Sequence, residues 1–224
     1  SCMSMHLQRD LESLEQNLLN QSSVVEQMVF RACQSLRELR VDIVQEVFAS
    51  EETVNYREVE IEEECLKILA LHQPVAVDLR RVATVLKING DLERIADLAV
   101  NIGERTHSLS LYPDFQMPAN LDKMAESAIS MVRDALDSFV RLDVELARDV
   151  CARDDIVDEL NRQVISDVQA LIEVNPSDIE PAFHFYSASR HVERIADHAT
   201  NIAEDVIYLV DGDIARHRHD GIPY

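Results

Sequence analysis

Glycine and proline are scarce in this chain. Only 4 Gly and 6 Pro occur among its 224 residues, and tryptophan is absent. Average usage is about 7% for Gly and about 5% for Pro, and folds with many strands depend on turns rich in both. Hydrophobic residues make up 46% of the chain, which is enough for a buried core. We therefore expect an all-α protein of one large or two small domains.

Basic residues are also in short supply. The chain has 21 Lys and Arg against 42 Asp and Glu, which gives a formal net charge of −21. Such a charge repels phosphate backbones, and no stretch rich in Lys and Arg offsets it. The composition argues against nucleic-acid binding and favours cations or basic protein surfaces as partners.

Long apolar runs and paired cysteines are missing too. No segment approaches 18 consecutive apolar residues, and the N-terminus shows no signal-peptide pattern. We therefore expect a soluble, intracellular protein that does not insert into membranes. The four cysteines stand singly without CxxC spacing, which argues against a zinc site or a disulfide framework. Cys33 and Cys65 are expected to fill the core.

Apolar periodicity and the placement of the prolines predict six helices. From Leu7 to Val47, apolar residues recur at steps of three, four or seven, which is typical of a long amphipathic helix. A polar break at 50–53 ends this helix in the prediction, and Pro74 begins the third helix. The predicted helices span about 5–48, 53–72, 75–111, 119–149, 152–174 and 179–210.

An internal repeat divides the chain into two halves. Residues 92–104 (LERIADLAVNIGE) and 192–204 (VERIADHATNIAE) are identical at 9 of 13 positions, at an offset of 100. A repeat of this kind predicts two tandem antiparallel three-helix bundles related by pseudo-two-fold symmetry. We expect the first bundle at 5–112, a connector at 113–120, the second bundle at 119–212 and a tail at 213–224.

The repeated segment carries a polar stripe. At about 100° per residue, four polar side chains in each copy fall within about 80° of one another, on the side opposite the apolar Ile and Ala positions. A stripe of this kind is either a solvated face or a row of oxygen ligands, and its recurrence at the same positions favours ligands. The stripe consists of Glu93, Asp97, Asn101 and Glu104 in the first half and of Glu193, Asp197, Asn201 and Glu204 in the second.

Acids also pair on the second helix of each half. Glu58 with Glu62, and Asp154 with Asp158, are spaced i,i+4. Like charges at this spacing destabilise a helix by about 0.2–0.5 kcal/mol per pair, and a multivalent cation would relieve the repulsion. Oxygen ligands favour Mg²⁺, Ca²⁺ or Mn²⁺, and iron is a further candidate.

Three segments resemble a known family. They are HQPVAVDLRRVATVLK at 72–87, DLERIAD at 91–97 and VERIADHATNIAEDVIYLVDG at 192–212. On these motifs the chain, over about 7–212, resembles the PhoU family of phosphate-uptake regulators associated with phosphate-specific ABC transporters. The resemblance implies two three-helix bundles and, in some members, multinuclear metal clusters held by pairs of E(D)xxxD motifs.

The resemblance also implies ligands and partners. The motif falls on Glu93 with Asp97, Glu193 with Asp197, and Asp154 with Asp158. Glu58 and Glu62 stand at the remaining position, with a Glu where Asp is commoner. The metal ions would be divalent or trivalent, with Fe, Mn, Mg, Ca and Zn as candidates. Implied partners are the transporter's ATPase subunit, a membrane sensor histidine kinase and a second copy in a homodimer. The implied role is negative regulation in the cytoplasm, peripheral to the inner face of the membrane through these partners.

Other functions compete with the regulator. A purely structural helical scaffold would use its acids only for solubility, and a metal-dependent hydrolase or oxidase would use them for catalysis. The single Glu104–His107 ExxH pair has no second-half counterpart, which disfavours a di-iron enzyme. No phosphate loop or catalytic triad stands out, so we expect no enzymatic activity. Arg94 and Arg194 either form salt bridges with neighbouring helices or contact a ligand or partner, and His217 and His219 are expected in a solvated tail.

Overall fold

A computed structural model describes residues 2–212 of the protein, and all regular secondary structure within this range is helical. No strand occurs in the described residues, which confirms the all-α prediction. The helices are α1 (Cys2–Glu38), α2 (Val41–His72), α3 (Ala76–Leu109), α4 (Asn120–Arg141), α5 (Val144–Val174), the short 3₁₀ helix η1 (Pro176–Asp178) and α6 (Ile179–Asp211).

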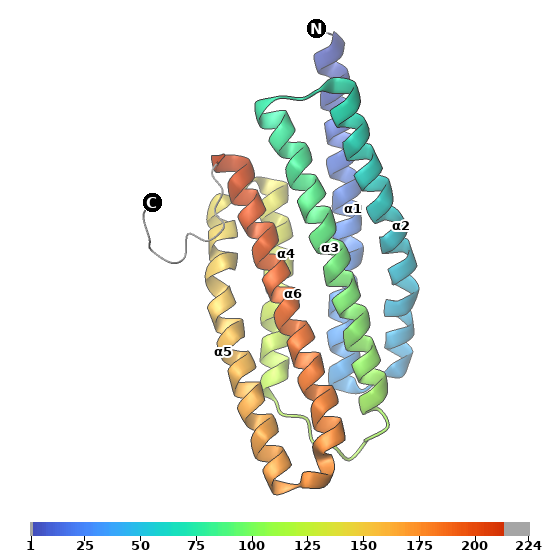
Figure 1. The fold of residues 1–224 in the computed structure, drawn as a ribbon, viewed down its shortest axis with the longest axis vertical. Coiled ribbons are helices and arrows are strands. Elements are labelled where there is room, and N and C mark those ends of the chain that lie inside the picture. Colours follow the sequence, from blue (N-terminus) through green and yellow to red (C-terminus); the bar gives the residue numbers. More distant parts are fainter. Residues whose placement is uncertain (1, 213–224) are drawn as a thin grey trace.

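The helices form two three-helix bundles that pack side by side. Helices α1, α2 and α3 contact one another, as do α4, α5 and α6. The last helices of the two bundles, α3 and α6, make the most extensive contact of the fold. Helices α2 and α5 therefore lie on the two outer edges of the molecule (Figure 1). This arrangement confirms the predicted two-repeat architecture.

The predicted ends of the first helix in each half are wrong. Helix α1 stops at Glu38 and α4 at Arg141, whereas the sequence predicted ends near 48 and 149. Leu39 and Leu142 adopt left-handed backbone conformations, with φ of 50° and 53°. The next amide in each turn donates to the carbonyl of Ser35 or Ser138, at 3.0 and 2.9 Å. These are Schellman-type C-caps, and the predicted break at 50–53 lies inside α2.

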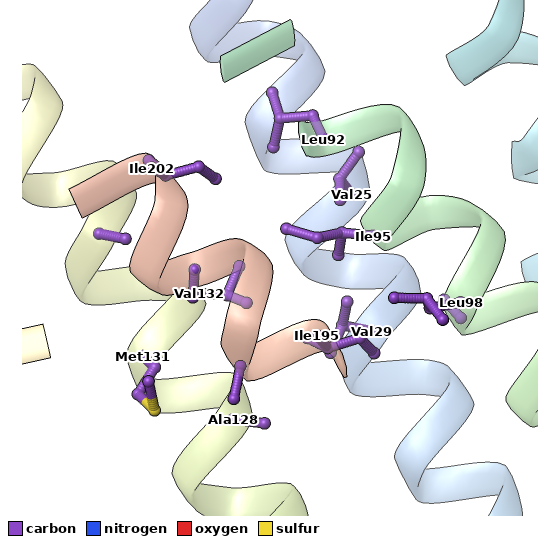
Figure 2. Close-up of a cluster of buried hydrophobic side chains, with 14 of the residues drawn as sticks. Val25, Val29, Leu92, Ile95, Leu98, Ala128, Met131, Val132, Ile195 and Ile202 are labelled. Carbon is purple, nitrogen blue, oxygen red and sulfur yellow. The ribbon is translucent and has the colours of Figure 1, made fainter. Parts of the chain in front are cut away.

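One hydrophobic core extends through both bundles. Figure 2 shows side chains of α1, α3, α4 and α6 meeting between the halves. Cys33 and Cys65 are buried, as predicted, and burial raises the pKa of each thiol to about 12. Labelled core residues in Figure 2 are Val25, Val29, Leu92, Ile95, Leu98, Ala128, Met131, Val132, Ile195 and Ile202.

The connector between the bundles is anchored on the start of α6. Phe115 is buried, and its ring centroid lies 6.3 Å from that of Phe185. Tyr112 lies against His184 with a centroid separation of 6.4 Å. The predicted tail at 213–224, with His217 and His219, lies outside the described residues. Among residues 2–212, no helix is both long and apolar enough to span a bilayer.

Candidate metal centres

The faces of α3 and α6 agree with the predicted stripes. Ile95, Ala99 and Ile102 are fully buried, as are the equivalent residues one hundred positions later. On the other side, Asp97 and Asp197 are exposed, while Glu93 and Glu193 are half-buried. The helical repeat therefore places the acids where the outer helices α2 and α5 pass alongside.

In the second half, α5 and α6 bring two acid pairs together. Partial burial, together with the charges of Asp197 and Asp158, raises the pKa of Asp154 to about 6. Desolvation likewise raises the pKa of Asp197, with added repulsion from Glu193 and Asp158. Four carboxylates from two helices thus share one region, which we call the second acid cluster: Asp154, Asp158, Glu193 and Asp197.

The second acid cluster opens onto a cleft between the bundles. The cleft has a volume of about 710 Å³, and Asp154 from α5 and Asp197 from α6 lie in its wall. Two further predicted ligands, Asn201 and Glu204, line it as well. One side-chain oxygen of Asp154, Oδ1, is buried and accepts no hydrogen bond from the described residues. This cluster therefore offers a free oxygen to a cation reached through the cleft.

In the first half, the contacts of the acids are different. Desolvation, Asp97 and Glu58 raise the pKa of Glu93, in that order of importance. Desolvation and the charge of Glu62 raise the pKa of Glu58. Glu58, Glu62, Glu93 and Asp97, the first acid cluster, thus repel one another along α2 and α3.

The two clusters are not at equivalent positions of the repeat. At an offset of 103, buried positions of α2 coincide with buried positions of α5. Asp154 and Asp158 therefore correspond to Glu51 and Asn55, whereas Glu58 corresponds to Asn161. The matching buried pairs are Val44 and Ala147, Val47 and Val150, Val54 and Val157, Ile61 and Val164, and Cys65 and Val168.

Glu51 and Asn55 join the candidate ligands for this reason. Matching acid pairs by spacing alone overlooked them. The sequence contains a signal at the two turns. Leu39 and Leu142 are each followed, two residues later, by a valine and then by an acid. Aligning these turns gives the offset of 103 directly.

The ends of the stripes have other contacts. The Asn201 amide donates to Asp91 Oδ1 at 3.3 Å. Glu104 is exposed and lies 3.8 Å from Arg105 in a weak ion pair. Arg94 and Arg194 form no ion pair within residues 2–212, so the salt-bridge interpretation is wrong for the described part of the chain. Arg94 instead lines the cleft beside the second acid cluster.

A buried polar pair that the sequence interpretation missed joins the two bundles. His198 Nδ1 lies 2.7 Å from Asp91 Oδ1, and both side chains are buried. Nearby, Lys87 Nζ donates to Asp205 Oδ1 at 3.2 Å and lies 4.9 Å from the centre of the Tyr208 ring. The helical period places residue 198 on the buried side of α6, so a histidine there was a detectable signal.

The donor set fits hard cations. Every predicted ligand presents a carboxylate or amide oxygen, and Mg²⁺, Ca²⁺ and Mn²⁺ prefer such ligands. Among the described side chains, no three or more His, Cys, Asp or Glu are gathered closely enough to hold a metal ion. Neighbouring carboxylates repel one another, and of the four in the second acid cluster Glu193 pairs with Arg190 at 2.5 Å. Binding a cation would require the carboxylate side chains to converge.

Comparisons with known proteins agree with this architecture. Residues 18–106 and 121–206 both match the PhoU domain. The chain is 37% identical over 215 residues to the phosphate-specific transport system accessory protein PhoU homolog of Aquifex aeolicus (strain VF5), covering 96% of this chain and 97% of that protein. A homolog of the same description from Deinococcus radiodurans is 35% identical over 206 residues, covering 92% of this chain and 97% of the relative.

Solved structures show the same fold. The crystal structure of PhoU from Pseudomonas aeruginosa superposes with a TM-score of 0.88 at 34% identity, covering 92% of this chain and 99% of that one. The phosphate transport system regulatory protein PhoU from Streptococcus pneumoniae gives a TM-score of 0.87 at 24% identity, over 93% and 98% of the two chains, and supports the fold alone. On the matches of both halves, the chain belongs to the PhoU family.

Proposed function

We propose that the protein is a non-enzymatic negative regulator of phosphate uptake and of phosphate-starvation signalling. Its partners would be the ATPase subunit of a phosphate ABC transporter and a membrane sensor histidine kinase. The observation that carries the proposal is the match of both halves to the PhoU domain, together with relatives described as accessory proteins of a phosphate-specific transport system.

Metal ions bound by the acids would be part of this role. In the second half, Asp154, Asp158, Glu193 and Asp197 would hold them, with Asn201 and Glu204 at the edge of the cleft. In the first half, Glu93 and Asp97 would bind ions together with acids of α2, for which Glu51, Glu58 and Glu62 are the candidates. A bound cation would supply positive charge that neutralises the clustered carboxylates and tethers the outer helix of each bundle to α3 or α6. The described acids would then bind and orient the ion.

Docking would depend on the protein's charge. A net charge of −21 attracts basic partner surfaces and accelerates encounter by electrostatic steering. Association should therefore weaken as salt rises, because the Debye length falls to about 3 Å at 1 M. The test is co-purification with the transporter complex at low salt and at about 0.5 M salt. Equal amounts of bound protein at the two salt concentrations would contradict electrostatic steering.

Complementation tests the proposal. A bacterial host that lacks its own PhoU protein would carry a phosphate-starvation reporter and be grown with ample phosphate. We expect the wild-type chain to silence the reporter. A variant with Glu93→Gln, Asp97→Asn, Glu193→Gln and Asp197→Asn should leave it active.

A charge-matched variant is the control. It removes four exposed carboxylates elsewhere, by Glu12→Gln, Asp122→Asn, Glu126→Gln and Glu173→Gln, and should repress like the wild type. Full repression by the first variant would refute the metal part of the proposal. A wild-type chain that does not repress would refute the regulator, and phosphate-ester hydrolysis lost with Asp97→Asn and Asp197→Asn would establish an enzyme instead.

A further inference from the structure

The outward face of α2 is apolar where a solvated helix is normally polar. Tyr56, Val59 and Leu66 are 66%, 50% and 54% exposed. With Glu63 and Ala70 they recur at alternating steps of three and four, the heptad spacing of a helix that packs along a second helix. At about 100° per residue these five positions fall within about 80° of one another. We call them the α2 outer face: Tyr56, Val59, Glu63, Leu66 and Ala70.

This face has no partner within the described chain. The core side of α2, with Val54, Ile61 and Cys65, lies on the opposite side of the helix. Among the described elements, helix α2 packs only on α1 and α3, and it forms one outer edge of the molecule (Figure 1). The exposed apolar side chains therefore add nothing to the described core.

The equivalent face of α5 shows that the fold does not need this apolar surface. At the offset of 103, every position of the α2 outer face has a polar and exposed counterpart. Both helices occupy the same place in their bundles, so packing cannot explain the difference. The counterparts are Glu159, Arg162, Ser166, Gln169 and Glu173.

Acids surround the apolar residues of the α2 outer face. Glu52 lies on the same side of the helix as Tyr56, and the neighbouring Glu60 raises the pKa of the Tyr56 phenol. Glu60, Glu63 and Glu64 line an adjoining groove of about 480 Å³ between α1 and α2. Arg57 and Lys67 line the same groove, so its acids outnumber its bases by one. A second copy of the chain would bring like charges into this region. A basic helix would neutralise them.

We propose that the α2 outer face is a docking site for a basic amphipathic helix of a partner protein. Apolar side chains of that helix would pack on Tyr56, Val59 and Leu66. Its Lys or Arg side chains would pair with Glu52, Glu63 and the acids of the adjoining groove. The inference names a surface for the docking role proposed above and rests on it.

A synthetic three-heptad peptide, with Leu at a and d and Lys at e and g, is the probe. The test variant gives the face its α5 counterparts through Tyr56→Glu, Val59→Arg and Leu66→Gln, which leaves the net charge unchanged. Fluorescence anisotropy should show binding at least tenfold weaker than to the wild type. The control Ile156→Gln removes a 54% exposed apolar side chain from α5 and should bind within twofold of the wild type.

Two results would overturn the inference. One is equal peptide binding by the test variant and the wild type, when circular dichroism shows both folded, because binding would then follow net charge alone. The other is a wild-type dimer in sedimentation that the test variant abolishes, because the face would then hold a second copy. The assay uses neither metal nor phosphate, so its failure is distinct from a failure of the reporter test.

Discussion

Replacing Asp154 by Asn should stabilise the metal-free protein above pH 6 and leave its stability nearly unchanged at about pH 4. In the folded protein, burial and the charges of Asp197 and Asp158 raise the pKa of Asp154 from 3.8 to about 6. In the unfolded chain this pKa returns to about 3.9. The folded state therefore binds a proton more tightly, and stability falls as pH rises from about 4 to about 6.

The size of the effect follows from the same shift. A full conversion of the pKa difference gives about 3 kcal/mol. Asp154 is only half-buried, and solvent screening reduces the expected gain to about 1 kcal/mol. For a chain of this length, that corresponds to a rise in melting temperature of about 2–4 °C.

Thermal melts followed by circular dichroism would measure this gain. The protein would be kept in a chelator, at pH 8 and at pH 4. Asp155→Asn is the matched control, because it removes the same charge from an exposed position of α5 and should change the melting temperature less. An Asp154→Asn variant that gains nothing at pH 8, or gains equally at both pH values, would refute the proposed crowding of carboxylates.

Three further predictions concern packing. Asp91→Ala removes the 2.7 Å partner of buried His198 and should lower the free energy of unfolding by about 2–3 kcal/mol. Adding His198→Leu should recover most of this loss, because Leu is the residue at the equivalent position 98. If the two substitutions instead lowered the free energy of unfolding additively, the Asp91–His198 contact would not be stabilising. Gly90→Ala should stabilise by about 0.5–1 kcal/mol in urea unfolding, because its Cβ would meet no atom within 4 Å. Gly103→Leu should destabilise by about 1–3 kcal/mol, because even a Cβ would lie 3.1 Å from a methyl group of α2. A Gly90→Ala variant that is less stable than the wild type, or a Gly103→Leu variant that is more stable, would contradict this packing.

Much of the fold could be predicted from the sequence. The apolar period and the Pro74 and Pro176 breaks indicate helices, and the repeated segments of α3 and α6 indicate two similar bundles. The turns after α1 and α4 could not be placed in this way, because Leu39 and Leu142 adopt the left-handed conformation that usually marks glycine. The apolar pattern continues through both turns, so the sequence places the end of the first helix of each half too late along the chain.

The candidate site was predictable within each helix but not between helices. Spacing alone places Glu93 and Asp97 on one side of α3, because the helical period determines that face. Which acids of α2 lie opposite them depends on where α2 begins. The misplaced first turn hid the correspondence of Asp154 with Glu51. The cleft beside Asp154 also requires α3 of the other bundle, which no local pattern reveals.

Elemental analysis of tag-free, dialysed protein tests the central claim most directly. It would be carried out beside the variant with Glu93→Gln, Asp97→Asn, Glu193→Gln and Asp197→Asn, after both had been offered Mg²⁺, Ca²⁺, Mn²⁺, Zn²⁺ and iron. The account predicts more than one ion per wild-type chain, few or none in the variant, and a metal-dependent rise in melting temperature for the wild type alone. Wild-type protein that takes up no ion, or a variant that holds as many ions as the wild type, would contradict it.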